Sequence, residues 1–132
     1  MTAGIKSRGI NILIVEDSQL IARKLQAILS LLDFVTIAGH AKNYTEAIAI
    51  LEIVEPDVII LDIQMPGKNG IELLTEIKLK NIHSRVVIFT NHADPYYRNL
   101  CIQLGADYFL DKSTEFEKIP IILKFYAAQY AV

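Results

Sequence analysis

The chain has 132 residues, 52% of them hydrophobic, with 13 basic and 15 acidic side chains, a formal net charge of −2 and one cysteine. This composition is typical of a single globular domain with its own core, and the lone Cys101 excludes an internal disulfide. No stretch approaches the roughly 20 apolar residues of a membrane-spanning helix and the basic residues are scattered, so we expect a cytoplasmic protein that binds neither membrane nor nucleic acid.

Short apolar runs rich in β-branched residues alternate along the chain with stretches of helical spacing. Strands are predicted at residues 10–15, 34–38, 58–61, 85–89 and 107–110. Helices are predicted over residues 21–32, 47–54 and 71–77, from Asp94-Pro95 to Gly105, and along an apolar stripe at 119–126. Asn43 and Glu46 have the spacing of a capping box, which predicts the start of the second helix. Thr114 and Glu117 have the same spacing and predict the start of the fifth.

The alternation of strands and helices predicts the fold class α/β, with a five-stranded parallel sheet. Right-handed crossovers place the helices on both faces of such a sheet. We expect this domain over residues 10–130, and we expect residues 1–9, which show no periodicity, to form a mobile leader. No residues remain for a second domain, so we expect a stand-alone protein.

Charged and hydroxyl side chains follow the predicted strands at the ends where parallel sheets bind ligands. Glu16 and Asp17 follow the first strand, Asp62 the third, Thr90 the fourth and Lys112 the fifth. If the first and third strands are neighbours, the carboxylates converge. Two unit charges about 5 Å apart repel by roughly 3 kcal/mol at an effective dielectric near 20, so a cation is needed. Carboxylate and carbonyl oxygens favour Mg²⁺, with Mn²⁺ as an alternative.

Each of these residues also has an ordinary structural explanation. The acid pair can begin the first helix, with Asp17 or Ser18 as N-cap, and Asp62 can form a turn. Lys112 can be a solvated charge at the end of a strand. Their coincidence at one edge of one sheet favours a functional site over these separate explanations.

An aspartate beside a divalent cation is typical of phosphoryl transfer, in which the carboxylate attacks phosphorus and forms an aspartyl phosphate. The cation and Lys112 would neutralise charge on the transferred group, and the Thr90 hydroxyl would donate to one of its oxygens. The sequence has no P-loop glycine pattern that would hold a nucleotide. We therefore expect the phosphoryl group to arrive on another molecule.

The segments around these residues resemble a response-regulator receiver domain, the phosphoacceptor of two-component signalling. The resemblance covers about residues 10–130 and is carried by residues 12–18 (ILIVEDS), 60–70 (ILDIQMPGKNG), 87–90 (VIFT) and 105–112 (GADYFLDK). It implies a flavodoxin-like strand order 2-1-3-4-5, with the first and third strands side by side.

By position, the resemblance implies that Asp62 is the phosphorylated residue. It implies that Asp17, Asp62 and the backbone carbonyl of Gln64 bind Mg²⁺, and that Glu16 does so through water. Lys112 would form an ion pair with the phosphoryl group. These residues are the candidate catalytic and metal-binding site.

The resemblance also implies a switch. On activation Thr90 would hydrogen-bond the phosphoryl group and Phe109 would turn inward. Permanent burial of Phe109 is the alternative, and Tyr108, on the opposite face of the strand, is the competing aromatic residue.

Three residues depart from the family pattern. Asn91 and His92 follow Thr90 where the family usually has a small residue first, so we expect unusual access to Asp62 and an unusual lifetime of the phosphoryl group. Ser113 follows Lys112 where Pro, often with a cis bond, is common. A different loop geometry is therefore expected after Lys112.

The family receives its phosphoryl group from a histidine kinase or a histidine phosphotransfer protein, and we expect the same donor here. Output is expected through an unknown downstream protein, read on the surface of the fourth helix, fifth strand and fifth helix. The last helix carries a second apolar stripe in addition to the one that packs on the sheet, which predicts a partner surface or a homodimer. The second stripe consists of Ile121, Phe125, Ala128 and Val132.

Other classes of protein share parts of this pattern. A degenerate receiver, which docks or dimerises without phosphorylation, is the main alternative. A haloacid-dehalogenase-type phosphatase needs a second Asp two residues after the nucleophile, where this chain has Gln64. A flavodoxin-like electron carrier needs hydroxyls and free amides where this chain has acids. We expect no enzyme activity beyond the domain's own phosphorylation and dephosphorylation.

Overall fold

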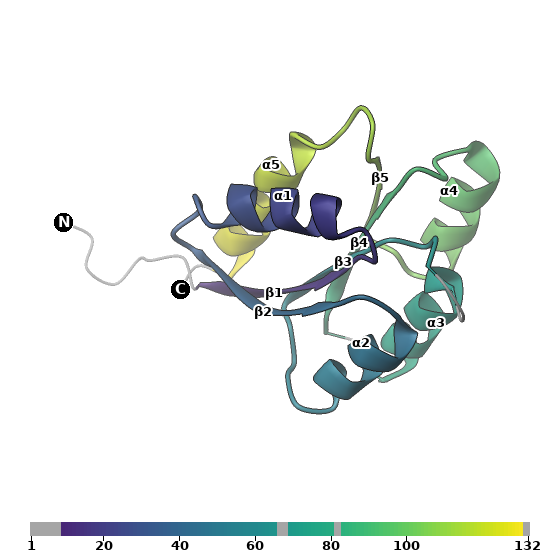
Figure 1. The fold of residues 1–132 in the computed structure, drawn as a ribbon, viewed down its shortest axis with the longest axis horizontal. Coiled ribbons are helices and arrows are strands. Elements are labelled where there is room, and N and C mark those ends of the chain that lie inside the picture. The colour runs from purple at the N-terminus through teal and green to yellow at the C-terminus, as the bar shows by residue number, and fades with distance from the viewer. Residues whose placement is uncertain (1–8, 66–68, 81–82, 131–132) are drawn as a thin grey trace.

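The computed structural model describes residues 9–65, 69–80 and 83–130. Figure 1 shows strands and helices alternating along these residues, as the sequence predicts. The strands are β1 (Ile10–Val15), β2 (Val35–Ala41), β3 (Val58–Leu61), β4 (Arg85–Thr90) and β5 (Tyr108–Asp111). The helices are α1 (Gln19–Leu29), α2 (Tyr44–Leu51), α3 (Gly70–Lys80), α4 (Pro95–Gln103) and α5 (Lys118–Gln129). The leader expected at residues 1–9 lies, except for Gly9, outside the described residues.

The strands form one parallel sheet in the order β2-β1-β3-β4-β5. The predicted α/β class and strand order are therefore confirmed. β1 and β3 are neighbours, and the last residue of β1, Val15, pairs with the last residue of β3, Leu61. The residues that follow these two strands, Glu16 and Asp62, consequently leave the sheet side by side.

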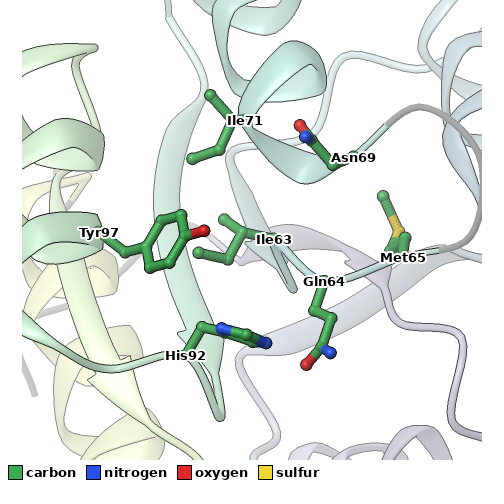
Figure 2. Close-up of a pocket in the computed structure, with 7 residues that line it drawn as sticks. All are labelled: Ile63, Gln64, Met65, Asn69, Ile71, His92 and Tyr97. Atoms are coloured by element: carbon green, nitrogen blue, oxygen red, sulfur yellow. The ribbon is translucent and has the colours of Figure 1, made fainter.

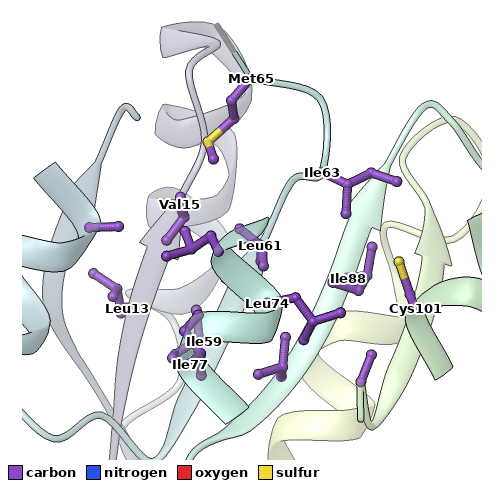
Figure 3. Close-up of a cluster of buried hydrophobic side chains, with 14 of the residues drawn as sticks. Leu13, Val15, Ile59, Leu61, Ile63, Met65, Leu74, Ile77, Ile88 and Cys101 are labelled. Atoms are coloured by element: carbon purple, nitrogen blue, oxygen red, sulfur yellow. The ribbon is translucent and has the colours of Figure 1, made fainter. Parts of the chain in front are cut away.

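Two hydrophobic cores lie on the two faces of the sheet. Alternate residues of β1 divide between them: Leu13 lies in the core that includes residues of α2, α3 and α4, whereas Ile12 lies in the core that includes residues of α1 and α5. Figure 3 shows the first of these cores, and Figure 1 shows α1 and α5 together on the other side of the sheet. All of β3 is buried, which explains its uninterrupted apolar sequence. No described helix has both the length and the apolar character to cross a membrane.

β2 runs three residues beyond its predicted end. The apolar run stops at Ala38, but pairing with β1 continues to Ala41 after a register shift. Ile12 pairs with Ile37 and Leu13 with Gly39, so one residue of β2 is bulged out of the ladder. The sequence pattern did not predict this extension because Gly39 and the polar His40 interrupt the apolar run.

The helix starts agree with the sequence in three of four places. Asp94 caps α4 as predicted, and its side chain accepts a hydrogen bond from Tyr97 N–H at 3.2 Å. Ser18, one of the two predicted caps of α1, accepts a hydrogen bond from Ile21 N–H at 3.3 Å. The Asn43 side chain accepts from Glu46 N–H at 2.9 Å, and the Glu46 carboxylate accepts from Lys42 N–H at 2.8 Å. The second bond goes to the residue before the cap, a small variation on the expected capping box.

The predicted capping box of α5 is wrong. α5 begins only at Lys118, and Glu117 makes no side-chain capping hydrogen bond. The preceding residues are tied into a loop, in which Thr114 N–H donates to the Asp111 carbonyl and the Glu115 carboxylate accepts from Asp111 N–H. These bonds hold the segment in a loop, so the helix begins later than the capping-box spacing predicts.

The first two helices end three residues before their predicted ends, α1 at Leu29 and α2 at Leu51. Leu32, which extended the predicted period, still packs against the core on the α1 side. Its N–H donates to the Leu29 carbonyl in an i−3 bond, so the backbone is no longer α-helical there although the side chain is still partly buried.

The start of α3 lies directly against the end of β3. Gly70 N–H donates to the Ile63 carbonyl at 3.0 Å. A Cβ at Gly70 would stand 2.4 Å from the Asp62 carbonyl oxygen and 2.4 Å from the Ile63 Cα, both backbone atoms. Only glycine allows this approach, which holds the start of α3 against the backbone of Asp62 and Ile63.

We expect Gly70→Ala to lower the free energy of unfolding by about 2 kcal/mol or more, because two backbone segments must separate to admit the methyl group. Urea unfolding measures this. Gly9→Ala is the matched control, since a Cβ there meets its nearest atom at an ordinary 3.6 Å. Equal stability of the two variants would contradict the packing role of Gly70.

Candidate functional site

A polar cavity of about 460 Å³ opens where β1, β3 and β5 end. It brings together all the charged residues that the sequence placed at this edge, together with Asn91 and Gln64. The lining consists of Glu16, Asp17, Ser18, Ile21, Asp62, Gln64, Met65, Asn91 and Lys112.

Three carboxylates meet in this cavity, as predicted from the strand order. Glu16, Asp17 and Asp62 each offer an oxygen, and these oxygens all lie within 4.8 Å of one another. Glu16 is 1% exposed and Asp62 4%, whereas Asp17 lies on the open side. Adjacent ends of β1 and β3 bring these acids together.

Glu16 is held through both oxygens of its side chain. Oε2 accepts from Ser18 N–H at 3.0 Å, and Oε1 pairs with Lys112 Nζ at 2.6 Å. Burial raises the pKa of Glu16 above its ordinary value, while the bonds from Lys112 and Ser18 act in the opposite direction. Glu16 is therefore a structural anchor of the site as well as a charge in it.

Asp62 is also held through both oxygens. Oδ1 accepts from Gln64 N–H at 3.0 Å, and Oδ2 accepts from Lys112 Nζ at 2.7 Å. Asp62 N–H in turn donates to the Val15 carbonyl at 3.0 Å, which extends the β1–β3 ladder to the site.

Lys112 reaches this pair from the far strand of the sheet. Its side chain is 7% exposed and bridges Glu16 and Asp62. Burial alone would lower its pKa, but the hydrogen bonds to Asp62 and Glu16 prevail and raise it above the ordinary value. Lys112 is thus a protonated, buried countercharge rather than the solvated charge that the alternative interpretation proposed.

The donor set fits a hard divalent cation. Carboxylate oxygens from Glu16, Asp17 and Asp62 are the ligand type that Mg²⁺ and Mn²⁺ prefer, and the open side next to Asp17 leaves room for water and a further ligand. Gln64 lies at the same cavity, and the role expected for its backbone carbonyl stays a prediction.

Thr90 does not line the cavity of the acids. It is fully buried at the end of β4, and its hydroxyl oxygen accepts a hydrogen bond from His92 N–H at 3.1 Å. Contact of this hydroxyl with a phosphoryl group would require the loop after β4 to move. Its predicted role as a switch stays a prediction.

Phe109 is buried, 4% exposed, in the core shared with α3 and α4. The Arg98 guanidinium of α4 lies 4.9 Å from the centre of its ring, and one guanidinium nitrogen donates to the Phe109 carbonyl at 3.2 Å. Tyr108 faces the other core, as strand alternation predicts. In this structure Phe109 is already in an inward position.

A second cavity, of about 260 Å³, adjoins the first and shares Gln64 and Met65 with it. Figure 2 shows His92 and Tyr97 on one side of this cavity and Met65 and Asn69 on the other. The rings of His92 and Tyr97 meet edge to face with centroids 5.6 Å apart. His92, one of the departures from the family pattern, therefore lines a cavity next to the one that holds Asp62, and its expected effect on access to Asp62 stays a prediction.

The loop after Lys112 is closed by side-chain hydrogen bonds. Ser113 donates to the Asp111 carboxylate through its N–H at 2.8 Å and through its hydroxyl at 2.6 Å. These bonds lower the pKa of Asp111 below its ordinary value. The described peptide bonds are all trans, so Ser113 replaces a proline turn by an aspartate-centred one.

Comparison with known proteins finds a consistent set of relatives. A sequence model of the response regulator receiver domain matches residues 12–124. The chain is 33% identical over 110 residues to the nitrate/nitrite response regulator protein NarL of Escherichia coli, which covers 82% of this chain and 50% of NarL. It is 41% identical over 105 residues to a protein-glutamate methylesterase/protein-glutamine glutaminase of Treponema denticola, which covers 78% of this chain and 28% of that protein. The chain thus spans half or less of these relatives' length.

Solved structures agree in fold. The response regulator domain of Thermotoga maritima CheB superposes with a TM-score of 0.79 at 29% identity, covering 93% of this chain and 96% of that one. The signal receiver domain of NarL from Mycobacterium tuberculosis superposes with a TM-score of 0.82 at 25% identity, covering 91% and 97%.

We expect Lys112→Met to lower the free energy of unfolding by about 3 kcal/mol at neutral pH, because it leaves two buried carboxylates without their countercharge. Added Mg²⁺ should restore part of this loss and stabilise the variant more than the wild type. Urea unfolding with and without Mg²⁺ measures both effects.

Lys80→Met is the control for this experiment, because Lys80 is 69% exposed and pairs with Glu76 at the surface. It should change stability little, since exposed ion pairs contribute little. A Lys112→Met variant as stable as this control would contradict the countercharge role of Lys112.

Proposed function

This chain belongs to the response regulator receiver domain family, and on that premise we propose that Asp62 accepts a phosphoryl group from a histidine kinase or a histidine phosphotransfer protein. The reaction would depend on Mg²⁺, or on Mn²⁺ in its place. The observation that carries the proposal is the pair of contacts from one buried ammonium, Lys112, to Asp62 at 2.7 Å and to Glu16 at 2.6 Å.

The chemistry follows from these contacts. A carboxylate oxygen of Asp62 attacks the phosphorus, an O–P bond forms, and the P–N bond to the donor imidazole breaks. Lys112 Nζ lies next to Asp62 and needs only a small movement to pair with an oxygen of the transferred group. A bound Mg²⁺ would neutralise further charge on that group, at the site formed by Glu16, Asp17 and Asp62.

Output would be transmitted by α4, β5 and α5. Phe109 lies three residues before Lys112 on β5, and Arg98 of α4 contacts both its ring and its carbonyl. The Arg98 guanidinium also lies 3.9 Å from the Glu115 carboxylate, which in turn pairs with Lys118 at 2.6 Å. Movement of Thr90 and the loop after β4 towards a phosphoryl group would disturb this chain of contacts.

The surface that would be read is apolar and hollowed. A cavity of about 660 Å³ lies along α4, β5 and α5, and three exposed apolar side chains border it. Ile102 is 47% exposed, Ile121 67% and Phe125 51%. Of the second stripe expected on the last helix, Ile121, Phe125 and Ala128 are exposed, and Val132 lies outside the described residues. We propose that a second copy of the chain, or an unknown downstream protein, covers this surface.

The proposal assigns the chain protein partners in the cytoplasm and no separate enzymatic substrate. The esterase in the name of the Treponema relative belongs to a protein of which the match covers 28%. Mixed charges at the output surface, with Arg98 and Lys118 beside Asp107 and Glu115, support a protein partner rather than nucleic acid.

Incubation with Mg²⁺ and a small phosphodonor should give a base-labile phosphoryl adduct, detected by intact mass. The adduct should be absent without metal and absent in Asp62→Asn, because that amide cannot attack phosphorus. The matched control is Asp33→Asn, an exposed aspartate in the loop before β2, which should be modified like the wild type. A folded protein that forms no adduct with any donor would instead favour the docking module that acts without phosphorylation.

Self-association through the output surface is tested by analytical ultracentrifugation over a concentration series with and without a phosphoryl mimic. We expect dimers with the mimic, and a shift back to monomer in Phe125→Glu, because a buried unpaired charge opposes association. Leu31→Glu, at a position 83% exposed outside this surface, is the control and should still dimerise. A wild type that stays monomeric at every concentration, with and without the mimic, would contradict dimerisation. The downstream protein would then be the partner that covers this surface.

A further inference from the structure

His40 contacts the backbone of the acid pair from the neighbouring strand. Its Nε2 lies 2.8 Å from the Glu16 carbonyl oxygen. The β1–β2 ladder ends at the pair Val15 and Ala41, with a last bond from Glu16 N–H to the Ala41 carbonyl at 2.9 Å. The His40 ring therefore provides a donor to a carbonyl that lies just beyond the end of the ladder.

The bulge in β2 determines which face of the sheet the His40 side chain lies on. Before the bulge, Ile37 faces the core on the α1 side, and after it Ala41 faces the core on the α2 side. Alternate residues of a strand face opposite sides of the sheet. The extra residue therefore moves each later side chain of β2 to the opposite face from the one it would have without the bulge. His40, adjacent to Ala41, consequently faces the α1 side, where the chain turns from β1 into α1. Without the bulge it would face α2.

The hydrogen bond defines the state of the ring. A carbonyl oxygen can only accept, so His40 Nε2 must donate, and the neutral ring must carry its proton on Nε2. The charged ring would donate from the same atom. The contact is thus a fixed tie to the backbone in either state.

With this tie, Glu16 is fixed through every one of its polar atoms. The N–H is bonded to Ala41, the carbonyl to His40, and the carboxylate oxygens to Ser18 and Lys112. Asp17 is the next residue, and it stands on the exposed side of the cavity. Its direction is set by the peptide that His40 holds, since that peptide joins the two acids.

We propose that His40 is a positioning residue for the cation site, holding the Glu16–Asp17 peptide so that the Asp17 carboxylate is directed at Asp62 before a cation binds. The inference rests on the proposed Mg²⁺-dependent function. Preorganisation of this kind raises affinity because binding no longer has to order the turn. Partners behind a metal site typically change affinity by about tenfold or more when removed.

The test compares two substitutions. His40→Phe keeps a ring of similar shape and removes the donor, whereas His40→Gln restores an N–H at a similar reach. We expect the Phe variant to bind Mg²⁺ about tenfold more weakly by isothermal titration calorimetry and the Gln variant to recover most of the affinity. Thr36→Val, an exposed substitution on the same strand, should bind like the wild type.

A measurement on the wild type needs no variant to fold. Long-range ¹H–¹⁵N correlation spectra at a pH where the ring is neutral should show His40 protonated on Nε2. Protonation on Nδ1, or a folded Phe variant with wild-type Mg²⁺ affinity, would overturn the inference. A wild type that binds no Mg²⁺ would instead refute the proposed function.

Discussion

The arrangement of the site depends on one ammonium group between two buried carboxylates. Parallel pairing of β1 with β3 places Glu16 and Asp62 side by side whether or not their charges are compensated. Lys112 compensates them from β5, two strands away from β3. Because the interior is a poor solvent for charge, burying these two carboxylates together without a countercharge would be costly. The contact therefore links the far strand of the sheet to its centre.

This link also connects the site to the output surface. Lys112 directly follows β5, and Phe109 lies within the same short strand, where Arg98 holds its carbonyl and covers its ring. In the proposed function, Lys112 leaves Asp62 for the oxygens of the phosphoryl group, so the end of β5 experiences the change first. β5 is short and has few hydrogen bonds that could resist such a shift, and Arg98 of α4 is hydrogen-bonded to it directly. Only a few contacts are then needed to couple the site to the output surface.

Much of the site was predictable from the sequence because it depends on strand order. The uninterrupted apolar run of β3 is typical of a central strand, and the acids follow the two strands that the sheet order places side by side. What was not predictable depends on contacts that the local pattern does not show. Gly39 and His40 end the apolar run of β2, yet the ladder with β1 carries the strand to Ala41. Thr114 and Glu117 have capping spacing, but bonds to Asp111 keep this segment out of the helix.

The two turns beside the cavity are fixed by the same physical means. On one side, the turn after β1 is tied by the His40 ring to the Glu16 carbonyl. On the other, the turn after Lys112 is tied by Ser113 to the Asp111 carboxylate. In both turns a side chain supplies the restraint. His40 makes a hydrogen bond where the backbone ladder between β1 and β2 has ended, and Ser113 closes a turn where other family members commonly have a proline. Because both turns carry a charged residue of the cavity, fixing them limits the freedom of Asp17 and Lys112 to move apart. These hydrogen bonds thus add to the direct contacts of Lys112 with Glu16 and Asp62, which hold the charges close together.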